Sequence, residues 1–545
     1  MNQEVDKSIL AHRPARRRRP SRLVVAVVGA VLVVAGAALW LSSGGQTRPG
    51  RLVGANLAVS ADAGDPLNIS ANNSPSVARN PVDPANLVVA NRIDLPFYSC
   101  ALHASFDGGS TWAGIPVPFP DGEELPARCY APDVAYSPDG TLHMAYVTLK
   151  GTGNSPNAVW VVSSTDGGRT LSVPLRATGP LAFQVRLTAD PARAGRLHLT
   201  WLQAEEVGVL LFPTTNNPIQ MATSDDAGAT WSQPVRVSSP DRARVVAPSP
   251  TVGPQGQRYV LYLDLGEDRL DYAGAHQGRG GEPYQGTWSL ILARSTDQGQ
   301  TWQETVVDGA VRPTQRFVVF LPPSPDLVVD PVSGNLYAAF ADSQEGDPDV
   351  FLWASTDGGA TFAARRRVND TPVTDGTAQY LPKLALAPGG RVDIIYYDRR
   401  DDPANLINGV SLQTSADQGR SFTPRIRITD SGFDSRVGPG SERDFTDLGS
   451  RLALVSSKNR TLAVWTDTRA GTDVTSKQDL ARAIVQVPTP ARPSQGLRAL
   501  SAAMIIAGLA TAVVAARLRS RHPPAEPEVE DTPDPLSVPL HTATR

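Results

Sequence analysis

Cysteine and histidine are scarce in this 545-residue chain, which contains two cysteines and seven histidines. The histidines are scattered and no CxxC or HxxxH pair occurs, so the sequence offers no ligand set of the zinc type. An excess of one charge is also lacking, because 51 Lys and Arg stand against 54 Asp and Glu. A nucleic-acid binder normally carries a strongly basic domain. We therefore expect no metal, no cofactor and no nucleic-acid partner.

Long apolar runs occur only near the two ends of the chain. Residues 23–41 read LVVAVVGAVLVVAGAALWL, which is 19 residues without a charge and long enough to span a bilayer. Six arginines precede this run, and such a basic flank stays in the cytoplasm. We predict a basic cytoplasmic segment over 1–22 and a transmembrane helix or signal anchor over 23–41. A cleaved signal peptide is the alternative, although its apolar core is usually shorter.

The second apolar run, residues 499–516, reads ALSAAMIIAGLATAVVAA and is followed by Arg517, Arg519 and Arg521. It predicts a second transmembrane helix over 497–516 whose end is cytoplasmic. A buried core helix is the alternative. The remaining residues, 517–545, are rich in Pro and acidic residues and are predicted to be a disordered cytoplasmic tail. Both termini are thus expected inside the cell, with the long middle segment outside the cell membrane.

A short pattern, Ser-x-Asp-x-Gly-x-Thr/Ser followed by an aromatic residue or Leu, occurs six times. Successive copies begin 59, 60, 71, 60 and 60 residues apart, and this regular spacing indicates a repeat architecture. Asp and Ser side chains accept bonds from nearby backbone amides, and Gly permits positive φ, so each copy predicts a tight turn. The copies are SFDGGSTW (105–112), STDGGRTL (164–171), SDDAGATW (224–231), STDQGQTW (295–302), STDGGATF (355–362) and SADQGRSF (415–422).

These motifs resemble the Asp-box, or bacterial neuraminidase repeat, of the sialidase superfamily. In that family the box is the turn between the third and fourth strands of a propeller blade. The resemblance implies an all-β, sialidase-like propeller over 51–488, in which the box aspartates have a structural role. These aspartates are Asp107, Asp166, Asp226, Asp297, Asp357 and Asp417.

The number of blades depends on the strands at the two ends of the repeat region. After the sixth box come three more strand-like runs, 450–457, 461–467 and 481–487, without a fourth. The segment 51–60 supplies a spare strand before the first unit. Pairing the two would close a ring of seven four-stranded blades and leave no open edge. Seven blades are favoured, and the six-bladed ring of true sialidases is the alternative.

The second strands of several units end in charged residues, which the blade topology places on the face opposite the boxes, called the top face here. Mixed Asp and Arg at one mouth can bind a carboxylate or sugar hydroxyls. Solvated loop charges and inter-blade salt bridges are the alternative, and Arg399 and Arg469 are expected to be near neighbours. The candidates are Arg92, Asp94, Asp342, Asp398, Arg399, Arg400, Asp467 and Arg469, with Glu205, Glu206 and Asp264 at similar positions.

The two cysteines, Cys100 and Cys129, map to the top face, at the start of the third strand of unit one and just before unit two. Outside the cell membrane the compartment is oxidising, so we expect a disulfide. Two free buried thiols are the alternative.

Three functions fit the sequence. The first is a membrane-anchored propeller that binds a glycan or protein ligand at its top face. The second is a sialidase-type exo-glycoside hydrolase, for which the resemblance implies three Arg, a Tyr–Glu pair and an Asp. The expected Arg-Ile-Pro signature is missing, and Arg92-Ile93-Asp94 stands nearest to it. The third is an assembly factor for a membrane complex, tethered by the two helices.

Overall fold

The computed structural model describes residues 22–42, 52–60, 69–205, 216–268, 284–313, 323–439, 448–487 and 495–517. The chain forms two compact units, one over Gly50–Pro488 and one from Met1–Pro49 together with Thr489–Arg545. The basic segment 1–22 and the tail 517–545, apart from Arg22 and Arg517, lie outside the described residues, as does Glu206.

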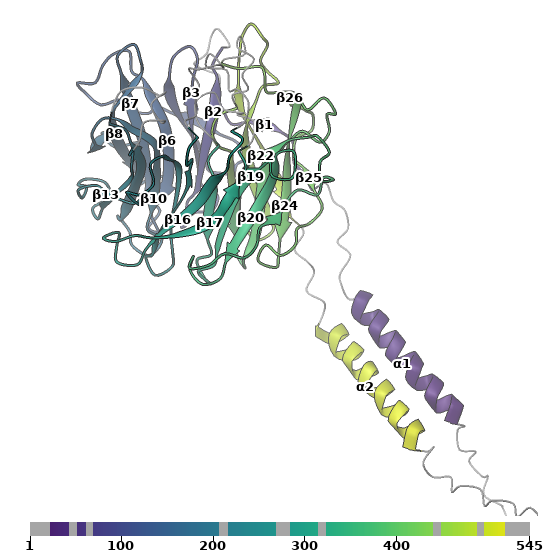
Figure 1. Ribbon diagram of the computed structural model, residues 1–545. Helices are drawn as coiled ribbons and strands as arrows, with labels where there is room; N and C mark the ends of the chain where they lie inside the picture. Colours follow the sequence, from purple (N-terminus) through teal and green to yellow (C-terminus); the bar gives the residue numbers. More distant parts are fainter. Residues whose placement is uncertain are drawn as a thin grey trace, which may run out of the picture. The chain divides into compact units, whose positions relative to one another are not determined.

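The larger unit is a β-propeller of seven sheets (Figure 1). In six of them the strands pair in sequence order, and in the seventh the outer strand comes from the start of the repeat region. The first four blades are β2 (Asn72–Arg79), β3 (Leu87–Ile93), β4 (Ser99–Ser105) and β5 (Ala113–Ile115); β6 (Cys129–Tyr136), β7 (Leu142–Lys150), β8 (Ser155–Ser164) and β9 (Leu175–Thr178); β10 (Ala182–Ala189), β11 (Leu197–Gln203), β12 (Ile219–Ser224) and β13 (Val235–Arg236); and β14 (Val245–Val252), β15 (Arg258–Asp264), β16 (Trp288–Ser295) and β17 (Gln303–Val311).

The fifth blade contains β18 (Asp326–Val329), β19 (Leu336–Asp342), β20 (Asp349–Ser355) and β21 (Arg366–Arg367). The sixth contains β22 (Gln379–Ala387), β23 (Arg391–Asp398), β24 (Ile407–Ser415) and β25 (Ile426–Arg427), and β26 (Phe433–Asp434) also pairs with β24.

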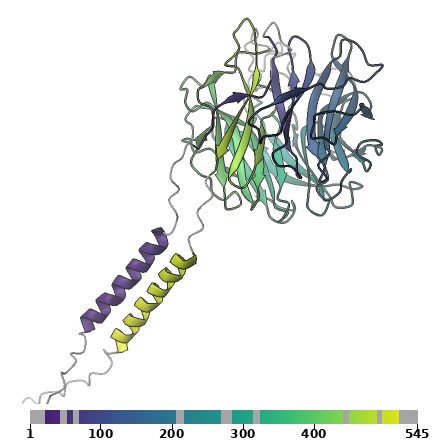
Figure 2. The same ribbon diagram turned by 180° about the vertical axis from the view of Figure 1, so that it is seen from behind.

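The ring closes in the seventh blade, where strands from both ends of the repeat region meet. β27 (Ala453–Ser456), β28 (Arg460–Asp467) and β29 (Asp479–Gln486) supply three strands, and β1 (Leu57–Ala58) pairs with β29 as the fourth. The purple β1 lies beside the yellow-green strands in Figure 2. The seven-bladed prediction is confirmed, and so is the use of segment 51–60 to close the ring.

The apolar core lies between neighbouring blades, because each inner sheet is covered on both faces. The second strands are therefore almost wholly buried, and some read as nearly continuous apolar runs, as β19 does over Leu336–Ala341. One cluster, for example, joins Val147 and Val159 of the second blade to Leu199 and Trp201 of the third. Burial between blades, rather than strand alternation, explains these sequences.

Each of the six repeated motifs forms a turn between the third and fourth strands of its blade. In the first turn Asp107 accepts hydrogen bonds from the Thr111 amide at 2.9 Å and the Thr111 hydroxyl at 2.7 Å, while Ser105 Oγ accepts one from the Gly109 amide at 2.9 Å. These bonds hold the pKa of Asp107 down at about 2. The same pattern recurs at Asp166, Asp226, Asp297, Asp357 and Asp417.

The predicted disulfide between Cys100 and Cys129 is present. It joins β4 of the first blade to the first residue of β6 in the second, and the Cys129 amide also donates to Tyr98 O at 3.3 Å. The covalent link thus fixes the crossing between these two blades on the top face.

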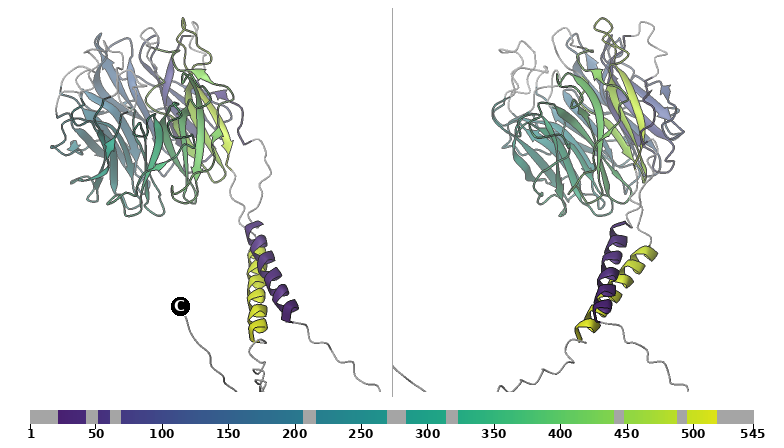
Figure 3. Two further views of the ribbon diagram at one scale, coloured as in Figure 1. Left: turned by 45° about the vertical axis from the view of Figure 1, so that its right-hand side comes forward. Right: turned by 90° about the vertical axis from the view of Figure 1, so that its right-hand side faces the viewer.

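The smaller unit contains two helices, α1 (Arg22–Ser42) and α2 (Gln495–Arg517), which lie side by side (Figure 3). Within the described residues, Ala499–Arg517 is the one helical stretch long and apolar enough to cross a membrane by length and composition. The apolar stretch of α1, Leu23–Ala38, is shorter. A second membrane span over 23–41 therefore stays a prediction.

Candidate functional site

The innermost strands of the propeller share a local irregularity near their first residues, at the end away from the box turns. In β2, β6, β10, β14 and β22 the pairing register shifts at this point, and one residue in each shift has positive φ. These residues are Ser74 (53°), Ala131 (50°), Gln184 (53°), Ala247 (59°) and Leu381 (54°). A bulge of this kind re-aims the side chains that follow it.

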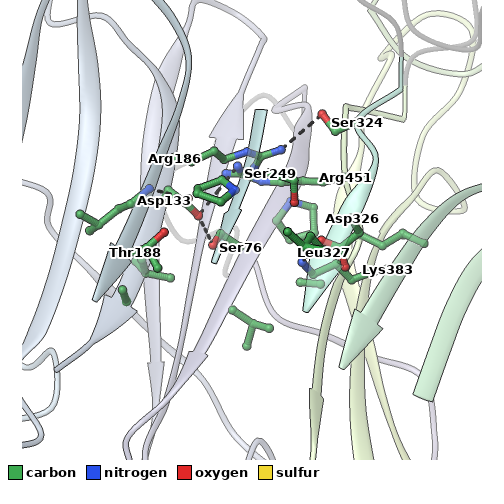
Figure 4. Close-up of a pocket in the computed structure, with 18 of the residues that line it drawn as sticks. Ser76, Asp133, Arg186, Thr188, Ser249, Ser324, Asp326, Leu327, Lys383 and Arg451 are labelled. Carbon is green, nitrogen blue, oxygen red and sulfur yellow. Dashed lines mark hydrogen bonds and ion pairs between the residues drawn. The ribbon is translucent and has the colours of Figure 1, made fainter. Parts of the chain in front are cut away.

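The residue two positions after each positive-φ residue lines one cavity on the propeller axis, with a volume of about 290 Å³ (Figure 4). The fifth and seventh blades contribute one residue each at the corresponding place. Together they form the axial ring, which consists of Ser76, Asp133, Arg186, Ser249, Asp326, Lys383 and Arg451.

The two carboxylates of the axial ring are engaged in holding neighbouring blades together. Asp326 accepts Lys383 Nζ at 2.7 Å and the Leu384 amide at 2.7 Å, which links the fifth blade to the sixth. Asp133 accepts the Ser76 hydroxyl at 2.5 Å and the Leu187 amide at 3.0 Å, which links the first three blades. Asp133 and Asp326 therefore have a structural role in the axial ring.

Arg186 has no such partner. Among the described residues no carboxylate lies within ion-pair distance of its guanidinium, and its one side-chain hydrogen bond runs across the channel to Ser324 Oγ at 3.4 Å (Figure 4). Arg186 is half-buried, so water hydrates its positive charge only in part. A polar acceptor placed here would complete its hydrogen bonding.

Arg451 stands beside Arg186 in the ring. It is half-buried, donates to Ser74 O at 3.1 Å and to Pro132 O, and lies 3.9 Å from Asp133. Burial first, and then the charge of Arg186, lower the pKa of Arg451 to about 10. The cavity therefore holds two guanidinium groups that repel each other, and an anion between them would accept hydrogen bonds from both.

Of the eight residues predicted at the top face, Arg92 affects the electrostatics of this cavity. Its charge also lowers the pKa of Arg451. Arg92 is buried, forms an ion pair with Asp94 at 2.6 Å and donates to Tyr130 OH at 3.2 Å. The pair Arg92–Asp94 therefore flanks the axial ring and is tied to it through the second blade.

Four of the predicted residues form two equivalent clamps between blades. Arg400 binds Asp398 of its own blade at 2.7 Å and Asp370 of the preceding blade. Arg469 binds Asp467 of its own blade at 2.6 Å and Asp430 of the preceding blade. Arg400, rather than Arg399, is thus the structural equivalent of Arg469.

The other two predicted residues are buried with protein partners as well. Arg399 donates to Asn408 Oδ1 at 3.0 Å, Asn405 O at 2.9 Å and Ser435 Oγ at 3.0 Å. Asp342 accepts the Gln344 amide at 2.7 Å and forms an ion pair with Arg365. A ligand-binding role for these residues stays a prediction. To bind a ligand, each side chain would have to give up a bond to its partner within the protein.

A Tyr–Glu pair exists, but it does not lie on the axis. Tyr262 of β15 donates to Glu304, which also accepts Arg242 Nε at 2.7 Å. Glu304 belongs to β17, the outermost strand of the fourth blade, and Arg242 also binds Asp264 at 2.7 Å. Tyr380 donates to Asn408, Tyr396 donates to Gln413, and Tyr397 donates to Thr466 O.

The sequence-based reasoning missed Arg186, Lys383 and Arg451. Arg186 and Lys383 lie inside strands, and Arg451 lies two residues before β27. A signal does exist, because a proline precedes the ring residue in five of the seven blades. These prolines are Pro75, Pro132, Pro248, Pro325 and Pro382.

No family model and no curated protein matches this chain. Solved structures with a similar fold include a protein of unknown function from Dyadobacter fermentans, with 18% identity, a TM-score of 0.45, and coverage of 81% of this chain and 100% of that one. An α-L-arabinofuranosidase from Fusarium graminearum has 14% identity and a TM-score of 0.43, with 67% and 98% covered. A Hadza microbial sialidase has 14% identity and a TM-score of 0.40, with 74% of each chain covered.

Proposed function

We propose that this protein is a membrane-anchored, extracytoplasmic propeller that binds the acidic end of a glycan in its axial cavity without cleaving it. The observation that carries the proposal is Arg186, a half-buried cation with no carboxylate partner among the described residues, beside the half-buried Arg451. The axial ring has three cations and two aspartates, so its formal charge is +1. An incoming carboxylate would reduce the repulsion between the two guanidinium groups.

The size of the cavity supports a small, terminal group as the ligand. Its volume of about 290 Å³ lies at the lower end of the range of about 300–1,000 Å³ typical of ligand pockets. The hydroxyls of Ser76 and Ser249 line the same cavity and suit the hydroxyls of a sugar ring. A terminal uronic or sialic acid combines a carboxylate with such hydroxyls.

Binding rather than hydrolysis is supported by the position of the Tyr–Glu pair. A sialidase-type reaction needs a phenol nucleophile at the sugar, whereas Tyr262 and Glu304 lie between blades toward the outer strand. Burial and the hydrogen bond to Glu304 raise the pKa of Tyr262 well above its ordinary value. Because the phenol then stays protonated, Tyr262 is a poor nucleophile. Its contacts are those of a structural residue.

The placement outside the cell membrane rests on two features. α2 is apolar enough to cross a membrane, and a disulfide of the kind formed in oxidising compartments joins the first two blades. The basic residues that flank both apolar segments favour cytoplasmic termini.

The test uses residues 46–490, which contain the whole propeller unit. We expect this fragment to bind glycans that end in uronic or sialic acid on a glycan array, to ignore their neutral counterparts, and to leave a fluorogenic sialoside intact. Release of the fluorophore would establish the hydrolase alternative. Failure to bind any acidic glycan, combined with co-purification of the full chain with a membrane complex, would favour the assembly-factor alternative.

A further inference from the structure

The two terminal helices approach each other so closely that side chains are excluded from the contact. A Cβ atom on Gly29 would lie 2.5 Å from Thr511 Oγ1 and 3.0 Å from Gly508 O. A Cβ atom on Gly508 would lie 2.6 Å from Val33 Cγ2 and 2.7 Å from Gly29 O. Backbone therefore packs against backbone at this level of the pair.

The same contact continues one heptad further along each helix, in the antiparallel sense. A Cβ atom on Gly36 would lie 2.8 Å from Ile505 Cγ1 and 3.1 Å from Ser501 O. Ser501 is buried, and its hydroxyl donates to Gly36 O at 2.6 Å. Small residues that admit close backbone approach, together with an interhelical hydrogen bond, are what hold helices together in lipid.

The length of α1 allows it to share the bilayer with α2. Its 21 residues rise about 31 Å, which matches the hydrocarbon thickness of about 30 Å. Because the two helices are antiparallel, a pair within one bilayer returns both chain ends to the same side.

The short connections to the propeller favour pairing of α1 with α2 of the same chain. In the seventh blade the Gln486 amide donates to Leu52 O at 2.7 Å, so the first and last described segments of the propeller lie next to each other. α1 ends at Ser42 and α2 begins at Gln495, ten and nine residues from those two positions. Short connections of this kind give an effective concentration of about millimolar for pairing within the chain.

We infer that α1 remains in the mature protein as a second membrane segment, paired with α2 of the same chain through the Gly29–Gly36 face. The anchor is then a helical hairpin rather than a single span with a removed leader. This inference does not depend on the ligand of the axial cavity.

The experiment uses the full chain in membranes and a cysteine pair, V33C with M504C, which leaves the glycines and Ser501 in place. The register that sets Gly29 opposite Gly508 and Gly36 opposite Ser501 also sets these two half-buried residues opposite each other. The two native cysteines are bonded to each other, so the introduced thiols are the ones free to react. A protease site inserted in the Gly-rich segment 273–286 separates the two halves of the chain after oxidation. The matched control replaces M504C by I506C, because Ile506 is exposed on α2 two residues away.

We expect the two halves to stay joined in non-reducing gels for V33C with M504C, at least fivefold more than for the control. A product of twice the chain mass would identify a second copy as the partner and overturn the inference. Equal, low joining in both variants would also overturn it. Independently of any variant, an N-terminal tag on the wild-type chain must persist in the mature protein, and its loss would show that α1 is removed.

Discussion

Replacing Arg186 by Met separates the ligand-binding role of this residue from a structural role. In the folded protein its guanidinium makes one side-chain hydrogen bond, to Ser324 Oγ at 3.4 Å, and no ion pair with a described residue. Losing that bond costs about 0.5–1.5 kcal/mol at most. Arg186 is also the second cause, after burial, of the lowered pKa of Arg451, so its removal relieves a repulsion between the two guanidinium groups. The two effects oppose each other, and the melting temperature should hardly change.

Binding should respond very differently to the same substitution. Hydrogen bonds from a guanidinium to a carboxylate contribute about 1.5–3 kcal/mol, so the affinity should fall roughly 10- to 150-fold. Titration calorimetry of residues 46–490 with glucuronate and with N-acetylneuraminate measures this directly. R176M is the matched control, because Arg176 is exposed on β9, and its affinity should equal that of the wild type. A large drop in melting temperature with unchanged affinity would refute the assignment and make Arg186 a structural residue.

Four further outcomes follow from the structure. D357A removes the bonds from Thr361 and Ser355 and should lower the free energy of unfolding by about 1–3 kcal/mol in denaturant titrations, whereas a selective loss of binding at unchanged stability would contradict a structural role. Hydrogen bonds within the turns lower the pKa of Asp107, Asp226, Asp297, Asp357 and Asp417 from 3.8 to about 2, so their contribution to stability is complete above about pH 4 and is lost as the pH falls toward 2; a stability profile that stays flat across this window would be evidence against it. C100S opens a loop with a sequence separation of 29 and should cost about 3 kcal/mol, which melting with and without reductant checks. Reporters fused at residues 60 and 530 should report opposite sides of the membrane, and a cytoplasmic signal from both would be incompatible with the proposed topology.

The fold could be predicted from the sequence because its signals repeat. The spacing of the six motifs marks the blades, and the spare segment 51–60 matches the strand that the seventh blade lacks. The cysteine pair could be predicted because both positions map to one crossing between blades. Each of these inferences depends on order along the chain, which the propeller topology converts directly into position.

The site could not be predicted in the same way, because charge in a loop does not reveal its partner. Arg400 and Arg469 lie in conspicuously charged loops, yet they bind Asp370 and Asp430 of the preceding blade, 30 and 39 residues away in the sequence. Arg186 lies within a strand, and a local bulge at Gln184 determines where it points. Neither the inter-blade partner nor the bulge follows from hydrophobic periodicity.

A crystal structure of residues 46–490 with a bound uronic or sialic acid tests the central claim most directly. The account predicts the carboxylate between Arg186 and Arg451 in the axial cavity, within hydrogen-bond distance of both guanidinium groups. A carboxylate bound instead at Arg400 or Arg469 in the top-face loops, with the axial cavity occupied by water alone, would contradict it.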